Sequence, residues 1–263
     1  GQNVRELIPI LKRFGIGMVR MGGASSADRE SAFQNAAIMF DAGFDVLMNY
    51  SVTYQRRKNP SLTMEQLLQE FRGWIRKYKS KITVLETENE ANLFISLAEN
   101  KKWIAAMSRI VREEAPGGKI AGPTSCRTDF AWLEGALADG GAEYLDILSE
   151  HPYRKYPEAP DYGEDVQAVR RLINRYKPEL KHYATEAGSV QPPLLPGNKM
   201  IDYVRITSAR DLRNMLLGFG NGLNSYNQFA ISMWQSGIGW NSTYMGNRET
   251  DGAQLPAPLL FAM

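Results

Sequence analysis

An α/β barrel of the (β/α)8 type is the fold that the sequence predicts, and three observations carry this prediction. The length of 263 residues suits one large α/β barrel. Short apolar runs alternate with amphipathic stretches, which favours a parallel sheet covered by helices. The apolar runs recur roughly every 30 to 40 residues, as expected for units of one strand and one helix. We therefore expect residues 1–263 to form a single domain.

The predicted strands are short and apolar, as strands buried on both faces of a parallel sheet usually are. They cover Gly17–Met21, Asp45–Asn49, Ile82–Glu86, Lys119–Gly122, Leu145–Ser149, Lys181–Thr185 and Leu223–Asn227. A complete barrel needs one strand more, and the chain opens on a helix. We expect the first strand to lie upstream of residue 1, with an incomplete barrel as the alternative.

The predicted helices carry apolar residues at helical spacing. In Met64–Tyr78, for example, Leu67, Phe71 and Ile75 share one face, and Thr63 with Gln66 has the spacing of a capping box. The remaining predicted helices are Val4–Phe14, Ser31–Ala42, Trp103–Glu114, Asp129–Leu137, Glu164–Tyr176 and Ile201–Leu217. Their aromatic residues are most simply core residues.

The composition excludes several classes of protein. The net charge is +2 and no basic stripe is present, so we expect no nucleic-acid partner. No apolar stretch is long enough to span a membrane. Cys126 is the only cysteine, so no internal disulfide can form, and with two histidines we expect no metal or other cofactor. No signal peptide is visible at the start, yet we expect a secreted or periplasmic protein.

Active sites of this fold lie at the carboxyl ends of the strands, where one polar segment stands out. In Glu86-Thr87-Glu88-Asn89-Glu90, three carboxylates lie within five residues. An extended strand would place Glu86, Glu88 and Glu90 on one face. Crowding would then raise their pKa values, which suits a general acid. A solvated acidic loop is the alternative for this segment taken alone.

Two further strand ends carry candidate residues. Glu186 ends the strand Lys181–Thr185 and is followed by small residues that leave room for a ligand. His151 and Tyr153 flank a proline after another strand. A helix-start glutamate and a buried core histidine are the structural alternatives. Two carboxylates from different strands that meet in one barrel mouth match the machinery of glycoside hydrolysis.

These motifs resemble those of the retaining glycoside hydrolases on (β/α)8 barrels, and most closely family 39 of that clan. The Asn89-Glu90 pair, with Glu86 three residues before Asn89, is similar to the clan's strand-four motif. The resemblance implies that Glu90 is the acid/base and that Asn89 bonds the 2-hydroxyl of the sugar. Thr185-Glu186-Ala187-Gly188 is similar to the strand-seven motif, which implies that Glu186 is the nucleophile.

Other segments extend this resemblance from about residue 4 to the end of the chain. It implies that Arg20 supports the nucleophile and that His151 and Tyr153 lie near the sugar. The sequence departs from the clan's pattern where Ala91 follows the acid/base, a place where proline is frequent. The predicted last strand also lacks the clan's tryptophan platform, which Trp234 or Trp240 would replace unless they only pack the loop.

The resemblance thus implies an O-glycosidase that cleaves an oligosaccharide or polysaccharide with retention, on a single catalytic domain. One alternative is a carbohydrate-binding barrel that has lost catalysis, which would not need both glutamates. A metal-dependent or phosphate-binding barrel enzyme is another, but no glycine-rich loop follows the last two predicted strands. A structural module, the remaining alternative, would not need polar strand ends.

Overall fold

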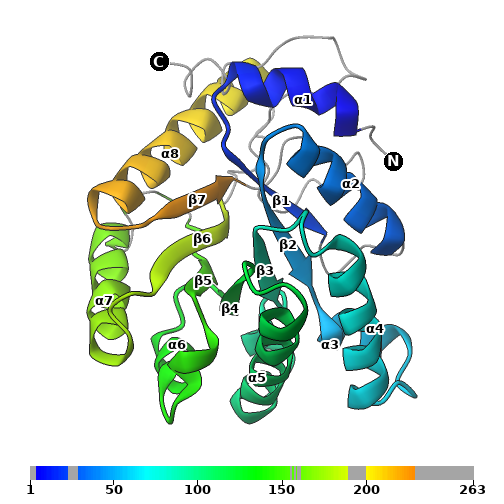
Figure 1. Cartoon of the computed structure of the whole chain (residues 1–263). Helices are drawn as coiled ribbons and strands as arrows, with labels where there is room; N and C mark the ends of the chain where they lie inside the picture. Colours follow the sequence, from blue (N-terminus) through cyan, green and yellow to red (C-terminus); the bar gives the residue numbers. More distant parts are fainter. Residues whose placement is uncertain are drawn as a thin grey trace.

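Seven parallel strands form one sheet in which each strand pairs with the next along the chain (Figure 1). The computed structural model describes residues 4–22, 29–154, 156, 158, 161–188 and 200–228. Of residues 200–208 and 228 it describes the backbone alone. The strands are β1 (Met18–Gly22), β2 (Asp45–Tyr50), β3 (Val84–Thr87), β4 (Lys119–Cys126), β5 (Ile147–His151), β6 (Lys181–Ala187) and β7 (Ser225–Gln228). All seven predicted strands are confirmed, with ends that differ by a few residues.

The sheet curves into a nearly closed barrel. The last strand comes back beside the first, where Ser225 Oγ lies 3.9 Å from Met18 Sδ. Each strand is parallel to its neighbour because a helix carries the chain back between consecutive strands. The predicted α/β barrel is therefore confirmed, with seven strands in the part of the chain that the structure describes.

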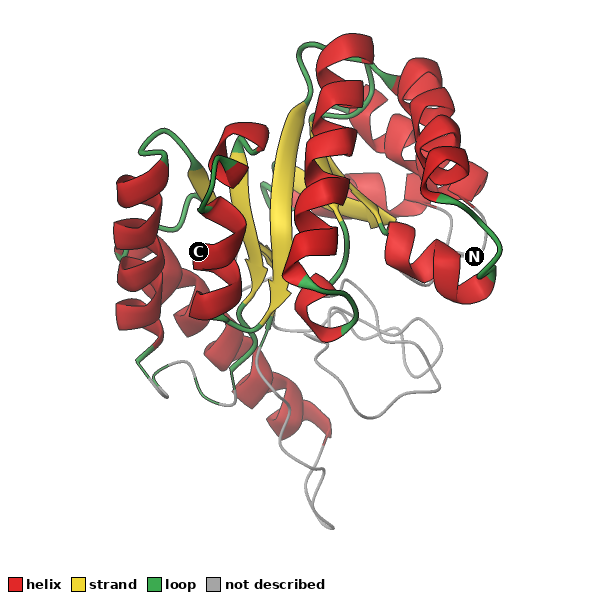
Figure 2. Cartoon of the chain, turned by 90° about the horizontal axis from the view of Figure 1, so that it is seen from below, coloured by secondary structure: helices red, strands yellow, loops and turns green. Residues whose placement is uncertain are grey.

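Helices surround the sheet (Figure 2). They are α1 (Val4–Arg13), α2 (Arg29–Asp41), α3 (Val52–Lys58), α4 (Met64–Tyr78), α5 (Leu97–Glu114), α6 (Phe130–Leu137), α7 (Tyr162–Tyr176) and α8 (Met200–Gly220), with 3-10 turns η1 (Ala91–Leu93) and η2 (Gly141–Tyr144). Helix α4 has the predicted bounds and the predicted capping box. The sequence did not predict α3, because seven residues are too few to display a helical period.

Two apolar layers hold the barrel together. Inside it, each strand from β1 to β6 contributes one side chain to an inner layer of Met18, Leu47, Val84, Ala121, Ile147 and Tyr183. Between sheet and helices lies a larger core that buries Phe33, Phe71 and Trp103 completely. The predicted core role of the helix aromatics is confirmed for these three. Within the described residues, no helix combines the length and apolar character needed to cross a membrane.

Candidate active site

The strand register aims polar side chains into the mouth of the barrel. Successive residues of a strand point to opposite faces, so a residue two positions beyond the inner layer points to the same interior. Arg20 stands two residues after Met18, and Glu86 stands two after Val84. In the same way Asn49 stands two residues after Leu47, and His151 stands four residues after Ile147.

Glu186 departs from this even spacing because strand β6 is irregular. It stands three residues after Tyr183, a member of the inner layer. The pairing of β6 with β7 shifts between Ala184 and Ala187, which marks a bulge or irregularity at that point. Such an irregularity re-aims the side chains that follow it. It brings the Glu186 carboxylate to the same mouth as the side chain of Arg20.

Arg20 is the hub of the site. Its Nε donates to Glu86 Oε2 at 2.7 Å, its Nη1 to Glu186 Oε2 at 2.7 Å, and its Nη2 to Asn89 Oδ1 at 2.8 Å. Burial lowers the pKa of Arg20, but the charges of Glu86 and Glu186 outweigh it, so the net pKa is raised. Asn89 uses its oxygen on Arg20, and its Nδ2 amide has no acceptor among the residues that the structure describes.

Both carboxylate oxygens of Glu186 accept hydrogen bonds. Arg20 occupies Oε2, and the Tyr153 hydroxyl donates to Oε1 at 2.5 Å. Burial, together with the charge and hydrogen bond of Glu186, raises the pKa of Tyr153 far above its ordinary value. The hydroxyl therefore stays protonated and acts as a donor. A cation and a neutral donor therefore hold this carboxylate in one position.

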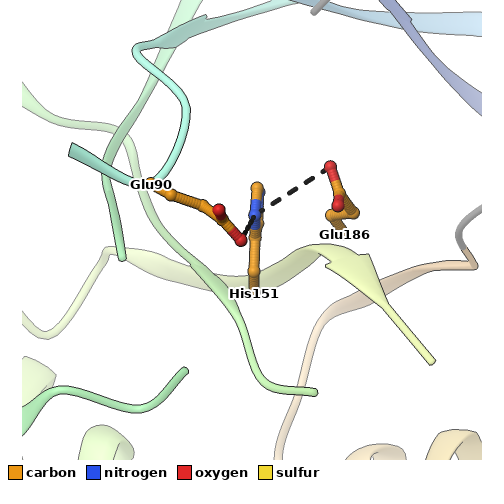
Figure 3. A group of neighbouring side chains, drawn as sticks. All are labelled: Glu90, His151 and Glu186. Atoms are coloured by element: carbon orange, nitrogen blue, oxygen red, sulfur yellow. Dashed lines mark hydrogen bonds and ion pairs between the residues drawn. The ribbon is translucent and has the colours of Figure 1, made fainter. Parts of the chain in front are cut away.

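Glu90 lies opposite Glu186, with His151 between them (Figure 3). His151 Nδ1 is 3.3 Å from Glu90 Oε1 and 3.9 Å from Glu186 Oε2. One oxygen of each glutamate and one nitrogen of His151 all lie within 4.8 Å of one another. The side chain of Glu90 is 21% exposed and that of Glu186 is 13% exposed. The two carboxylates thus face a common space that solvent reaches.

The expected high pKa of Glu90 is wrong for the protein without substrate. Burial raises the pKa of Glu90, but three interactions outweigh it. They are a hydrogen bond from His151, the charge of His151, and a hydrogen bond from the Cys126 thiol. The net pKa lies below the ordinary value. Burial, together with the charge of Glu90 and the hydrogen bond to it, raises the pKa of Cys126 to about 12. The thiol therefore stays protonated and donates. Glu90 is therefore ionised at neutral pH.

The expected common face of Glu86, Glu88 and Glu90 is also wrong. Strand β3 ends at Thr87, and Glu88 has a φ of 109°, so the chain leaves the extended conformation there. The fully buried Glu88 carboxylate turns away from the mouth and accepts from Ser51 Oγ at 2.7 Å and Thr53 N at 2.9 Å. Glu88 therefore ties the turn that carries Glu90 to the start of α3.

Glu88→Gln is expected to change how stability depends on pH. Burial raises the pKa of Glu88 from 4.5 to about 7, although its hydrogen bonds to Ser51 and Thr53 lower it in part. Between pH 4.5 and about pH 7 the unfolded chain releases a proton that the folded chain retains. The free energy of unfolding therefore falls as pH rises through this range. The loss approaches about 3 kcal/mol above pH 7, at about 1.4 kcal/mol for each pKa unit.

The check is the free energy of unfolding in urea from pH 4 to pH 8. Wild type should lose stability relative to Glu88→Gln across this range, because glutamine keeps the shape but does not titrate. Glu65→Gln, at an exposed position on α4, is the matched control. If wild type and Glu88→Gln show parallel curves, the raised pKa is wrong.

Geometry alone would also allow a metal ion at this site. Glu90, His151 and Glu186 each offer one ligand atom within the 4.8 Å cluster. However, both oxygens of Glu186 already accept from Arg20 and Tyr153. A cation at Oε2 would also meet the positive charge of Arg20. The trio therefore fits an acid–base site better than a metal site.

The structure brings together Glu90, Glu186, Asn89, Arg20, His151 and Tyr153, which are the predicted site residues that it describes. Trp234 and Trp240 lie outside the described residues, so the predicted sugar platform stays a prediction. Sequence reasoning missed Asn49, which donates to Glu86 at 3.0 Å, and Cys126 beside Glu90. Both stand at or near strand ends, so the positional rule applied to every strand would have found them.

Solved structures of glycoside hydrolases share this fold. A family 39 glycoside hydrolase from Bacteroides cellulosilyticus WH2 matches at a TM-score of 0.69 and 15% identity, over 86% of this chain and 54% of its own. The family 39 enzyme from Xanthomonas axonopodis pv. citri matches at a TM-score of 0.68 and 16% identity, over 98% of this chain and 62% of its own. A family 128 endo-β-1,3-glucanase from Amycolatopsis mediterranei matches at a TM-score of 0.58 and 16% identity, over 100% of this chain and 96% of its own.

These matches confirm, at the level of the fold, the resemblance to family 39 and its relatives. This chain spans about half to two-thirds of the length of the two family 39 enzymes. No protein-family model matches the sequence, and a search of curated proteins gave no significant match. The barrel fold of this chain is thus one that these glycoside hydrolases share.

Proposed function

We propose that the protein is a glycoside hydrolase that cleaves O-glycosidic bonds of an oligosaccharide or polysaccharide with retention. The observation that carries this proposal is the pair Glu90 and Glu186, of which one oxygen each lies within 4.8 Å of the other across the mouth. Retaining pairs are roughly 5 to 5.5 Å apart, whereas inverting pairs need roughly 6.5 to 9.5 Å to admit a water molecule. The shared fold with glycoside hydrolases of families 39 and 128 supports the same reaction class.

The proposed first step breaks the glycosidic bond. Glu186 attacks the anomeric carbon, the bond from that carbon to the leaving oxygen breaks, and Glu90 gives its proton to that oxygen. Arg20 and Tyr153 donate hydrogen bonds to Glu186 and fix its direction. The free Nδ2 of Asn89 is placed to bond a sugar hydroxyl. A glycosyl ester on Glu186 results.

The second step releases the sugar. Glu90, now ionised, takes a proton from a water molecule, whose oxygen attacks the anomeric carbon while the ester bond to Glu186 breaks. The low pKa of Glu90 in the free protein favours the ionised form that this step requires. For the first step Glu90 has to be protonated, and a bound sugar helps by excluding water, since burial raises a carboxyl pKa.

Cys126→Ala is expected to move the alkaline limb of the kcat/KM profile to higher pH. The thiol of Cys126 donates to Glu90 and thereby lowers its pKa, so its removal raises the pKa of the free enzyme's acid. The kcat/KM profile reports that value directly. Cys126→Ser is the matched control, because a hydroxyl still donates and should keep the limb near its wild-type position. An unchanged limb in Cys126→Ala would show that the thiol does not bond Glu90.

The proposed function is tested by following hydrolysis of a panel of aryl glycosides by proton NMR. We expect hydrolysis of at least one of these aryl glycosides, with a first-formed anomer that has the same configuration as the substrate. A first-formed anomer of opposite configuration would overturn retention. If no glycoside is cleaved while the protein still binds oligosaccharides, the carbohydrate-binding alternative holds instead.

A further inference from the structure

A groove of about 300 Å³ lies beside the turn that carries Glu90. One wall is the end of α3 with Pro60, and the other is formed by Phe94, Ile95 and Glu99. Its volume is at the lower end of the range for small-molecule sites. None of the catalytic steps above uses this groove.

The groove and Glu90 share one short structural unit. Glu90 caps the start of η1 and Phe94 caps its end. Only the three residues of η1 separate Phe94 from Glu90 along the chain. The Phe94 side chain is large and its residue is 45% exposed. The groove therefore lies next to Glu90 along the chain, at the opposite end of the same turn.

The groove is cationic, and one of its cations is available. Arg56, Arg57 and Lys58 end helix α3 and are exposed. Arg56 pairs with Glu99 at 2.6 Å. The guanidinium of Arg57 lies over the ring of Phe94, 4.4 Å from its centroid. In the described part of the chain, Arg57 has no carboxylate partner.

Stacking determines what Arg57 can bind. The Arg57 guanidinium sits over the Phe94 ring, and this contact with the π face uses none of its N–H groups on a carboxylate. Those donors form a planar fork that fits the two oxygens of a carboxylate. We propose that this groove binds a uronic acid unit, a sugar bearing a carboxylate, on the leaving-group side of the cleaved bond. The leaving-group assignment rests on the proposed function, because it assumes that Glu90 protonates that side.

Isothermal titration calorimetry with the Glu186→Gln protein, which avoids turnover, tests the proposal. The probes are trimers of galacturonic acid and of glucuronic acid, each as the free acid and as the methyl ester. At least one free acid should bind on the order of tenfold more tightly than its ester, because only the acid offers an ionised partner for the fork. Adding Arg57→Gln should remove this preference.

Lys102→Gln, at an exposed position on α5, is the matched control for loss of one positive charge and should keep the preference. The proposal is overturned if neither acid binds, if acids and esters bind equally, or if Lys102→Gln acts like Arg57→Gln. Hydrolysis of aryl glycosides by wild type is measured separately. Its absence would overturn the proposed function and the leaving-group assignment, while the calorimetry still reports on the groove.

Discussion

Glu186→Ala is expected to lower kcat by on the order of 10⁴-fold or more on every glycoside that the protein cleaves. Without the carboxylate no covalent intermediate forms, whatever the leaving group. Arg20 and Tyr153 would be left without the acceptor that both now share. Hydrolysis rates of a panel of aryl glycosides with graded leaving groups measure the effect. Glu65→Gln on the outer helix α4 should retain wild-type rates.

Glu90→Ala should behave differently from Glu186→Ala on the same panel. Loss of general acid catalysis costs about 10²- to 10⁴-fold when the leaving group needs a proton. The first step should be far less affected when the leaving group is a stable phenolate, because that group departs unprotonated. Added azide should then restore turnover by attacking the ester without a base. An equal loss with all leaving groups, and no effect of azide, would contradict the acid/base role of Glu90.

Arg20→Met is expected to impair both stability and activity. Glu86 is fully buried, and Arg20 provides its salt bridge at 2.6 Å. Removing one member of a buried ion pair leaves an uncompensated charge, which costs about 3 to 5 kcal/mol. Glu186 loses its cation at the same time, so kcat/KM should fall on the order of 10²-fold or more. Urea unfolding and aryl glycoside hydrolysis measure the two effects.

A double variant separates these two roles of Arg20. In Arg20→Met with Glu86→Gln, no buried carboxylate remains opposite the lost cation, so most of the stability should return. Activity should not return, because Glu186 and Asn89 still lack the guanidinium. Recovery of activity along with stability would show that Arg20 acts only through the fold.

Strand patterns made the fold and most of the site predictable from sequence. Short apolar runs marked every strand, and the carboxyl ends of parallel strands meet at one edge of a barrel. Two-residue alternation then brings Arg20 and Glu86 to the same interior as the inner apolar layer. Glu186 was predicted by its place after a strand and by its resemblance to a family motif, although the irregularity that aims it was not.

Two departures from prediction in the site depend on contacts between distant segments. Glu88 leaves the face of Glu86 because Ser51 and Thr53, more than thirty residues away, provide donors for its carboxylate. The pKa of Glu90 is lowered by His151 and Cys126 from two other strands. A sequence pattern records neighbours along the chain, so it cannot report which side chains a loop will meet.

Glu186 is proposed to attack the sugar, and trapping of the covalent intermediate would identify the attacking residue. A 2-deoxy-2-fluoro glycoside with an activated leaving group, of the sugar that the panel identifies, slows the second step more than the first, so the ester accumulates. Mass spectrometry of the digested protein should find one sugar on the peptide that contains Glu186. A sugar attached to Glu90 instead, or continued turnover with no labelled peptide, would contradict the claim.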